Sequence, residues 1–425
     1  MALYTKEDLS AMTVHTLRVV LRTDFKGVPG VMNKEELIDK ILSIQAGENP
    51  PVRSTKGRKP LDTFLTPVDV EIQLGDFGEF EGDVPSSVKG ILEIHRDGYG
   101  FIRRNDLSIT GQDVYVVKSL IKKHALKRGD EIVGECSQMR DSGIVALNSV
   151  NSVNGKANFE EKRQDILEFR PTYTDKKIPL YQTETPSLGV VDMFCPIGDG
   201  QRCIVLDDNG SRKTTFLKDL IRSLTASGKV VYLLSVCSKP EDVTAFAQSG
   251  CKVFEISAES QPQVIVRKVA LATEMIKRKL ETGENPVFVV TDLNSVIKAY
   301  NEHIANANVD KGFTEEGLTA HNLAIRTLNP AGNYGEKGSL TAIGVLKSSL
   351  NEGAYADVLE VANCVITLTD SKVKRRSYEI DPLRSYTIGD ENLLTAEQIA
   401  KADEYRAKLE KDDGFLQVIL DDLSK

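Results

Sequence analysis

The sequence lacks the features that mark several classes of protein. Its six cysteines include no C-x-x-C pair and its five histidines show no metal-ligand spacing, so neither a disulfide framework nor a zinc site is indicated. No apolar run reaches the roughly 18 residues that a membrane span needs. Charged residues interrupt the amino-terminal stretch, so no signal peptide is expected. We therefore expect a soluble, cytoplasmic protein with free thiols and no membrane contact.

An excess of positive charge is also missing. The 425 residues carry 54 Lys and Arg against 62 Asp and Glu, which gives a net charge of −8. Because such a chain is not a general polyanion binder, any surface that binds nucleic acid must be local. The length predicts about two or three domains, and a hydrophobic content of 40% supports packed cores.

Glycine is missing where one motif would require it. A predicted strand, polar loop and helix start have the layout of a phosphate-binding loop, G-x-x-x-x-G-K-[ST]. Lys213 and Thr214 match its end and Thr215 follows, but Asp207 and Arg212 occupy the two glycine positions. Glycine normally lets the loop approach phosphate closely with its N–H groups. Either this loop binds nucleotide with a damaged cradle, or the Lys-Thr pair is a chance match.

The chain divides into four parts by composition and pattern, which together predict a multidomain α/β protein. Residues 1–48 predict a small helical unit, and residues 49–88 a disordered linker rich in Pro, Gly and charge. Residues 89–153 hold five short strands, as in an oligonucleotide-binding barrel. In residues 171–425, apolar strands alternate with helices, which predicts a mainly parallel sheet covered on both faces.

One strand of the predicted barrel carries the pattern of an RNA-binding surface. Tyr99, Phe101 and Arg103 alternate along it and so share one face. Two exposed aromatic rings and a cation would stack bases and clamp a phosphate, which predicts single-stranded RNA as a partner. The alternative is that the rings fill the barrel core, but Gly98 and Gly100 beside Tyr99 favour an open surface. A local basic patch follows: Lys118, Lys122, Lys123, Lys127 and Arg128.

An acidic residue at the end of a predicted strand, Asp292, also indicates a nucleotide site in the carboxyl-terminal part. An apolar strand is predicted over residues 286–292 and ends in Asp292. Magnesium prefers oxygen ligands, so Asp292 and Thr214 are candidate Mg²⁺ ligands beside the phosphate loop. The alternative is that Asp292 simply caps the following helix.

Several segments of the chain resemble one protein family, in matching order and with similar gaps. They include GILEIHRDGYGFIR at residues 90–103, and further segments at residues 113–116, 196–202, 239–244, 298–301, 338–341 and 393–395. On these residues the chain resembles the bacterial transcription termination factor Rho over nearly its whole length. The resemblance implies a cold-shock-like RNA-binding barrel and a RecA-type core with ATP and Mg²⁺ as cofactors. It also implies a hexameric, RNA-dependent ATPase that releases transcripts from RNA polymerase.

This sequence matches the family at its RNA-contact positions but departs from it at its catalytic positions. Five positions match the family's RNA contacts: Tyr99, Phe101, Arg103, Asp113 and Tyr115. The family's catalytic glutamate falls at Ser238 and its arginine finger at Ile388, while Asp292 matches the magnesium aspartate only with a one-residue gap. A missing finger costs roughly 10³–10⁵ in rate. Hydrolysis of ATP is therefore expected to be impaired.

Three functions stay open on the sequence alone. The leading hypothesis is a Rho-like RNA-binding protein with a degenerate ATPase core. It would act in transcription termination or its regulation, as a homo-hexamer or another ring, with RNA polymerase or a functional Rho as a further partner. The second is a working RNA-dependent ATPase with unusual substitutions, and the third is an oligomeric scaffold.

Overall fold

The computed structural model describes residues 4–23, 33–46, 80–139, 143–157, 163, 165–180, 185–207, 213–311, 325–347, 356, 358–369, 378–412 and 414–423. The chain forms two compact units, Met1–Pro67 and Val68–Lys425. Residues 49–79 of the predicted linker, and Arg212 of the predicted phosphate loop, lie outside the described residues. No described helix is long and apolar enough to cross a membrane.

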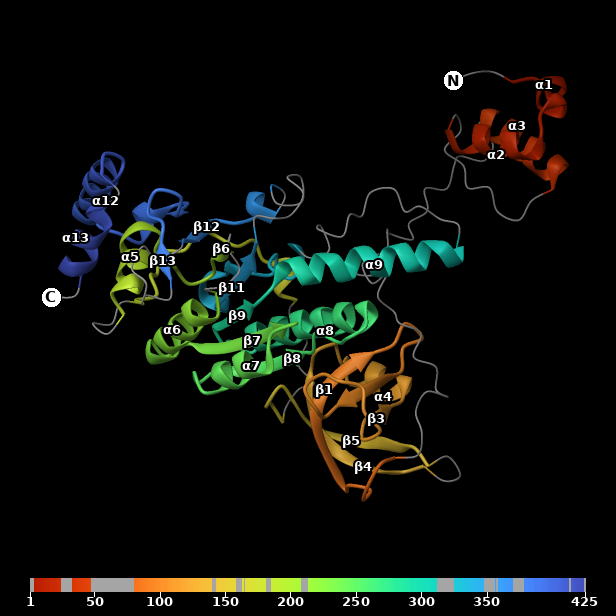
Figure 1. The fold of residues 1–425 in the computed structure, drawn as a ribbon. Coiled ribbons are helices and arrows are strands. Elements are labelled where there is room, and N and C mark those ends of the chain that lie inside the picture. Colours follow the sequence, from red (N-terminus) through yellow and green to blue (C-terminus); the bar gives the residue numbers. More distant parts are fainter. Residues whose placement is uncertain are drawn as a thin grey trace. The chain divides into compact units, whose positions relative to one another are not determined.

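The described residues of the first unit form three short helices, in agreement with the helical unit that its sequence predicts (Figure 1). They are α1 (Lys6–Ala11), α2 (Val14–Thr23) and α3 (Lys34–Gln45). Capping boxes begin two of them, at Thr5 before α1 and at Asn33 before α3. Each box satisfies two backbone N–H groups that the first helical turn leaves without a partner. Leu17, Leu37 and Ile41 are among the fully buried residues that join the three helices into one core.

The second unit begins with a closed five-stranded barrel in the order β1-β2-β3-β5-β4. Its elements are β1 (Ser87–Ile94), β2 (Gly100–Arg103), β3 (Val114–Val116), α4 (Lys118–Lys123), β4 (Glu131–Gln138) and β5 (Val145–Val153). Alternate residues such as Leu92, Ile102 and Val114 point inward and are fully buried. The five strands predicted for this part of the chain are therefore confirmed.

The rest of the second unit is built on a nine-stranded sheet with the main order β13-β12-β6-β11-β9-β7-β8. Its parallel strands are β6 (Arg202–Asp207), β7 (Val230–Val236), β8 (Lys252–Ile256), β9 (Pro286–Val290), β11 (Ser339–Leu346) and β12 (Cys364–Thr369). Short antiparallel strands pair at its margins: β10 (Gly332–Asn333), β13 (Glu379–Ile380) and β14 (Tyr386–Thr387). The predicted mainly parallel sheet is confirmed. The central strands β9 and β11 are buried along their whole length, as expected of strands covered on both faces.

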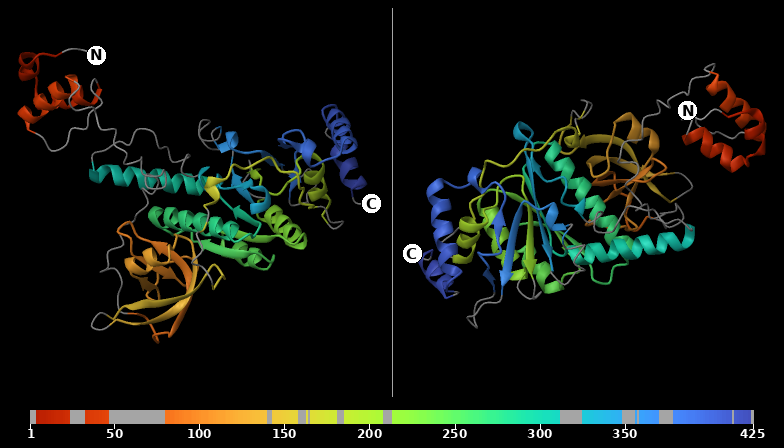
Figure 2. Two further views of the ribbon diagram at one scale, coloured as in Figure 1. Left: turned by 180° about the vertical axis from the view of Figure 1, so that it is seen from behind. Right: turned by 90° about the horizontal axis from the view of Figure 1, so that it is seen from above.

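Helices cover both faces of this sheet (Figure 2). One face packs against α8 (Pro262–Glu281) and α9 (Leu293–Lys311). The other packs against α5 (Pro186–Phe194), α6 (Lys213–Ala226), α7 (Pro240–Ala247), α12 (Ala396–Leu409) and α13 (Phe415–Asp422). Single 3₁₀ turns lie at Ile166–Glu168, Gly335–Lys337 and Asp390–Asn392. The mixed α/β fold class agrees with the sequence pattern.

The barrel lies directly against α8 of the sheet part. Gly129, in the turn before β4, has φ +84°, a conformation that favours glycine. A Cβ atom there would lie 2.5 Å from the backbone of Glu274 in α8, so the close approach also requires glycine. We call this contact between the barrel and α8 the seam.

Candidate nucleic-acid interface and phosphate loop

Three aromatic rings gather on the outer face of the barrel. Tyr99 precedes β2, Phe101 lies in β2, and Tyr115 of β3 is the direct cross-strand partner of Phe101. The ring centroids are 5.9 Å apart for Tyr99 and Phe101, 5.7 Å for Tyr99 and Tyr115, and 5.6 Å for Phe101 and Tyr115. His95 stacks on Tyr99 at 4.5 Å. We call Tyr99, Phe101 and Tyr115 the aromatic platform.

The three rings of the aromatic platform differ in exposure. Tyr99 and Tyr115 are half-buried, whereas Phe101 is only 3% exposed. The expectation that Phe101 is exposed is therefore wrong. The alternative, that Phe101 belongs to the barrel core, is also wrong, because Phe101 is not part of the apolar cluster inside the barrel. Burial raises the pKa of Tyr99, so its hydroxyl keeps its proton at neutral pH. Any base that stacks here would meet the two tyrosines.

Arg103 does not extend into solvent as a phosphate clamp would. It is 2% exposed, and its Nε donates to Glu93 Oε2 at 2.7 Å. One terminal nitrogen donates to Asp113 Oδ2 at 2.6 Å. The guanidinium carbon lies 5.1 Å from the ring centroid of Phe101, within cation–π distance. Arg103 and Asp113 therefore bind each other beneath the aromatic platform, which corrects the expectation of an exposed cation.

Glu93 is the centre of a buried charge cluster. Its Oε2 accepts bonds from Arg103 and from Arg267 of α8, both at 2.7 Å, and its Oε1 accepts one from Arg128 at 3.3 Å. Burial alone would raise the pKa of this carboxyl, but the three guanidinium groups outweigh it and hold the pKa below its usual value. Glu93 is therefore ionised, and a residue of α8 takes part in a site that otherwise belongs to the barrel.

The predicted basic patch is smaller than the sequence indicates. Lys118, Lys122 and Lys123 of α4 are exposed. Lys127 instead faces Glu281 of α8, with its Nζ 3.4 Å from the carboxylate, and Arg128 binds Glu93. Of the five cations, Lys127 thus joins the barrel to α8, and Arg128 is paired with the buried Glu93 within the barrel.

The residues after the predicted phosphate loop meet carboxylates. Lys213 begins α6, and its Nζ donates to Asp292 Oδ2 at 3.0 Å and to the carbonyl oxygen of Thr291 at 3.1 Å. Thr214 Oγ1 donates to Asp242 Oδ2 at 3.1 Å, and Thr215 follows in the same helical turn. These groups follow the carboxyl ends of β6, β7 and β9, which is where open α/β sheets bind ligands.

Asp292 has two partners at once. Besides Lys213, it accepts the backbone N–H of Ser295 at 3.0 Å and so caps α9. The structure thus supports the cap that was considered for Asp292, while its role as a Mg²⁺ ligand stays a prediction. Among the residues that the structure describes, no group of three or more His, Cys, Asp or Glu side chains is placed to hold a metal ion. The two predicted Mg²⁺ ligands, Thr214 and Asp292, are each bonded to a different partner.

The two positions that the resemblance to Rho assigns to catalysis, Ser238 and Ile388, lie at opposite ends of the parallel strands. Ser238 follows β7, and its Oγ lies 3.2 Å from Thr291 Oγ1, beside the Lys213 contact. Ile388 follows β14, is 47% exposed, and donates its N–H to Asn363 just before β12 begins. Because β7 and β12 run parallel, Ser238 lies at the carboxyl edge and Ile388 at the amino edge. One chain does not bring the two together.

Three residues of these sites had no motif to indicate them. Asp242, Glu93 and Arg267 each bind a predicted site residue or its direct partner. The signal that could have found Glu93 is its place as the one acidic residue of β1, between the apolar Leu92 and Ile94. Arg267 lies on the helix α8, 174 residues from Glu93, and gave no such signal.

Known proteins resemble both the barrel and most of the chain. Residues 88–158 match the family model described as "Rho termination factor, RNA-binding domain". Transcription termination factor Rho of Mycobacterium bovis is 28% identical over 342 residues, which cover 75% of this chain and 56% of that protein. The Thermotoga maritima factor is 28% identical over 340 residues, covering 74% and 76%. The chain is therefore similar to the Rho proteins over about three quarters of its length.

The likeness to Rho is partial in length. The chain spans about 56% of the length of the mycobacterial Rho proteins that it matches. Rho of Streptobacillus moniliformis is 30% identical over 218 residues, half of this chain and 51% of that protein. Among solved structures, "a prototypical ATPase from the type III secretion system of pathogenic bacteria" aligns with a TM-score of 0.45 and 19% identity, covering 56% of this chain and 69% of that one.

Proposed function

We propose that this Rho-like chain binds single-stranded RNA on the aromatic platform and acts in transcription termination or its regulation. The observation that carries the proposal is the cluster of Tyr99, Phe101 and Tyr115 on the outer face of a barrel that matches the Rho RNA-binding domain. Stacking on such rings is tolerant of sequence and suits single strands. The exposed lysines of α4 supply positive charge nearby.

Under this proposal hydrolysis of ATP is impaired. Ser238 has no carboxylate with which to orient an attacking water, and Ile388 carries no charge for a neighbouring site. Lys213 is bound to Asp292, so a phosphate group must displace a carboxylate to reach it. Binding of ATP with Mg²⁺ would use Lys213, Thr214, Thr215 and Asp292, with low affinity. The assembly would be a homo-hexamer or another ring, and RNA polymerase or a functional Rho would be its protein partner.

One observation favours the alternative of a working ATPase. Asp242 accepts a hydrogen bond from Thr214, so a carboxylate lies beside the start of α6, where a nucleotide would bind. Asp242 could then substitute for the missing glutamate at Ser238. On this alternative, Asp242→Asn would abolish hydrolysis.

RNA binding is tested with the two half-buried tyrosines. We expect Tyr99→Ala with Tyr115→Ala to weaken binding of a labelled cytidine-rich RNA by about 2–6 kcal/mol, at roughly 1–3 per stacked base. Fluorescence anisotropy measures the affinity, and circular dichroism checks the fold. Tyr173→Ala is the matched control, because Tyr173 is 66% exposed and lies outside the barrel. If the double variant binds the RNA as tightly as the control and the unaltered chain do, RNA binding at the platform is rejected.

A further inference from the structure

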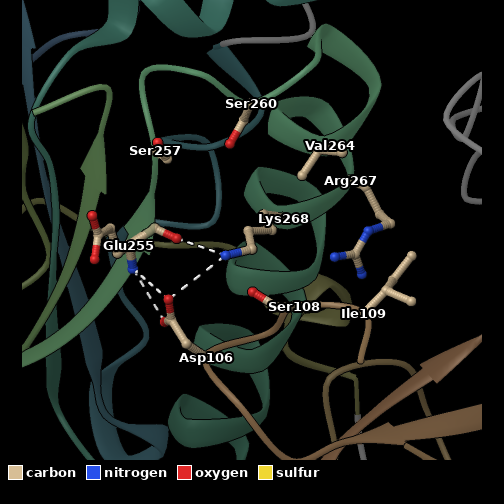
Figure 3. A pocket seen from close by; sticks show the side chains of 9 residues that line it. All are labelled: Asp106, Ser108, Ile109, Glu255, Ser257, Ser260, Val264, Arg267 and Lys268. Atoms are coloured by element: carbon tan, nitrogen blue, oxygen red, sulfur yellow. Dashed lines mark hydrogen bonds and ion pairs between the residues drawn. The ribbon is translucent and has the colours of Figure 1, made fainter. Parts of the chain in front are cut away.

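The seam brings a helix of the sheet part next to the aromatic platform. Figure 3 shows Arg267 and Lys268 extending from α8 toward the loop between β2 and β3, which contributes Asp106, Ser108 and Ile109. A pocket of about 460 Å³ opens between them. We propose that Arg267 is a positioning residue for the RNA-binding surface: a side chain of the sheet part that sets the geometry of the barrel's platform. The inference rests on the proposed RNA binding and deepens it.

Arg267 holds two parts of the barrel at once. It is 2% exposed, although it belongs to a residue type that is rarely fully buried. One terminal nitrogen donates to Glu93 Oε2 of β1 at 2.7 Å, and the other donates to the carbonyl oxygen of Leu107 at 2.8 Å. The planar guanidinium therefore fixes β1 relative to the chain that leaves β2.

The contact with Glu93 leads directly to the platform. The same oxygen, Oε2, accepts the Nε of Arg103 at 2.7 Å. Arg103 lies over the ring of Phe101, and Glu93 is the direct cross-strand partner of Phe101 in the β1–β2 register. Because one carboxylate oxygen is shared by Arg267 and Arg103, loss of Arg267 lets Glu93 shift, and Arg103 and the Phe101 ring that it contacts shift with it.

Two other ion pairs between α8 and the barrel join residues that do not belong to the platform. Lys279 of α8 binds Glu131 at 2.6 Å, and Lys268 lies 3.6 Å from Asp106. Asp106 also accepts the backbone N–H of Glu255, as Figure 3 shows. These contacts attach the barrel to the sheet part at sites away from Tyr99 and Tyr115. The chain thus supplies a control: a second cation on α8 that binds a barrel carboxylate but not the platform.

The experiment compares Arg267→Gln, Arg267→Lys and Lys279→Gln in the full chain. We expect Arg267→Gln to weaken binding of a cytidine-rich RNA by roughly 3- to 30-fold, as for residues that couple two sites. Arg267→Lys keeps the charge without the two-pronged geometry, so it should restore part of the affinity. Lys279→Gln should bind within twofold of the unaltered chain. Thermal unfolding of all three measures the loss of seam stability separately from RNA binding.

A double-mutant cycle and a spectrum complete the test. Glu93→Gln combined with Arg267→Gln should cost less affinity than the sum of the two single changes, since both act through one contact. The chain has no tryptophan, so tyrosine fluorescence is readable, and its change on RNA binding should shrink in Arg267→Gln but not in Lys279→Gln.

The outcomes separate the two proposals. Unaltered RNA affinity in Arg267→Gln, or equal weakening by Lys279→Gln, overturns the positioning role while RNA binding stands. If Arg267→Gln fails to fold, full RNA affinity in Arg267→Lys overturns the positioning role instead. No RNA binding by the unaltered chain removes the proposed function, and the positioning role with it.

Discussion

At the scale of single residues, the ion pair of Lys213 and Asp292 would affect how tightly a nucleotide binds. Their ammonium and carboxylate groups are 3.0 Å apart, at the point where a phosphate-loop lysine would meet phosphate. An incoming phosphate has to replace Asp292 and tolerate its charge. A bound Mg²⁺ would change the sign of that effect, because Asp292 could then serve the cation. The same carboxylate is thus unfavourable without the metal ion and favourable with it.

This leads to a prediction for Asp292→Asn. Without Mg²⁺, the variant should bind a fluorescent ATP analogue several-fold more tightly, since one unit charge near a surface is worth about 1 kcal/mol or more. With Mg²⁺, the gain should disappear. Asparagine still caps α9, so the fold is preserved. Titrations with and without Mg²⁺ measure the two affinities, and equal affinity of both proteins in the absence of Mg²⁺ would contradict the prediction.

At the scale of elements, α8 joins the sheet part to the barrel. One side of the helix packs in the core that it shares with α9 and the sheet. Another side carries Arg267 and Lys279, which bind the barrel carboxylates Glu93 and Glu131. Glu131 also binds Lys89 of β1 at 2.7 Å, so a single carboxylate bridges β1, β4 and α8. The helix therefore depends on ionised carboxylates for part of its attachment.

The pH dependence of this attachment can be predicted. Burial alone would raise the pKa of Glu131, but bonds from Lys279 and Lys89 outweigh it and lower the pKa from 4.5 to about 2. A carboxyl whose pKa is lowered on folding stabilises the fold above its unfolded value and loses that effect as pH falls through the folded value. The stability advantage of the unaltered chain over Glu131→Gln should be complete above about pH 5 and should fade between pH 4.5 and 2.

Urea unfolding of both proteins across that range measures the difference. Glu404→Gln is the control, because Glu404 forms a single exposed pair with Lys408 on α12. Exposed pairs contribute little, so its difference from the unaltered chain should stay near zero at every pH. A Glu131→Gln difference that is independent of pH would contradict the assignment of the ionised carboxylate.

The same elements explain how far the sequence can predict this protein. The barrel strands were predictable because alternation along Val114–Val116 and its neighbours is a local signal, as are the Asn33 cap and the apolar runs of β9 and β11. The burial of Arg103 was not predictable. Its face follows from alternation, but its partner Glu93 is 10 residues away, and Arg267 lies 174 residues from Glu93. Charge pairs between distant elements leave no periodic trace in a sequence.

At the scale of the whole molecule, the two positions that the resemblance to Rho assigns to catalysis lie far apart within one chain. Ser238 and Lys213 lie at the carboxyl edge of the sheet, and Ile388 lies at the amino edge. A strand of six residues such as β12 spans about 20 Å, at roughly 3.3 Å per residue. A residue placed at position 388 therefore cannot act on the phosphate region of its own chain. It can act only on a neighbouring chain, if such an assembly forms.

Repair of catalysis should follow this geometry. We expect RNA-stimulated phosphate release by the unaltered chain to stay close to that of Lys213→Ala. Arg212→Gly alone supplies neither a carboxylate nor a charge, so hydrolysis should remain low. Arg212→Gly with Ser238→Glu and Ile388→Arg should recover activity only at concentrations where the chain is oligomeric, because groups that act together are not additive. Full activity from Arg212→Gly alone would show that the base and the finger lie elsewhere.

The close approach at Gly129 has a practical meaning for anyone who excises the RNA-binding region. The family match ends at residue 158, but cutting there removes the α8 backbone on which Gly129 rests, and it leaves the Leu107 carbonyl and one side of Glu93 without Arg267. Such a fragment would carry every residue of the platform in a relaxed arrangement, and affinities measured on it would understate those of the parent. A fragment that begins at residue 80 and extends through α8 and the sheet it covers preserves the surface that RNA would meet.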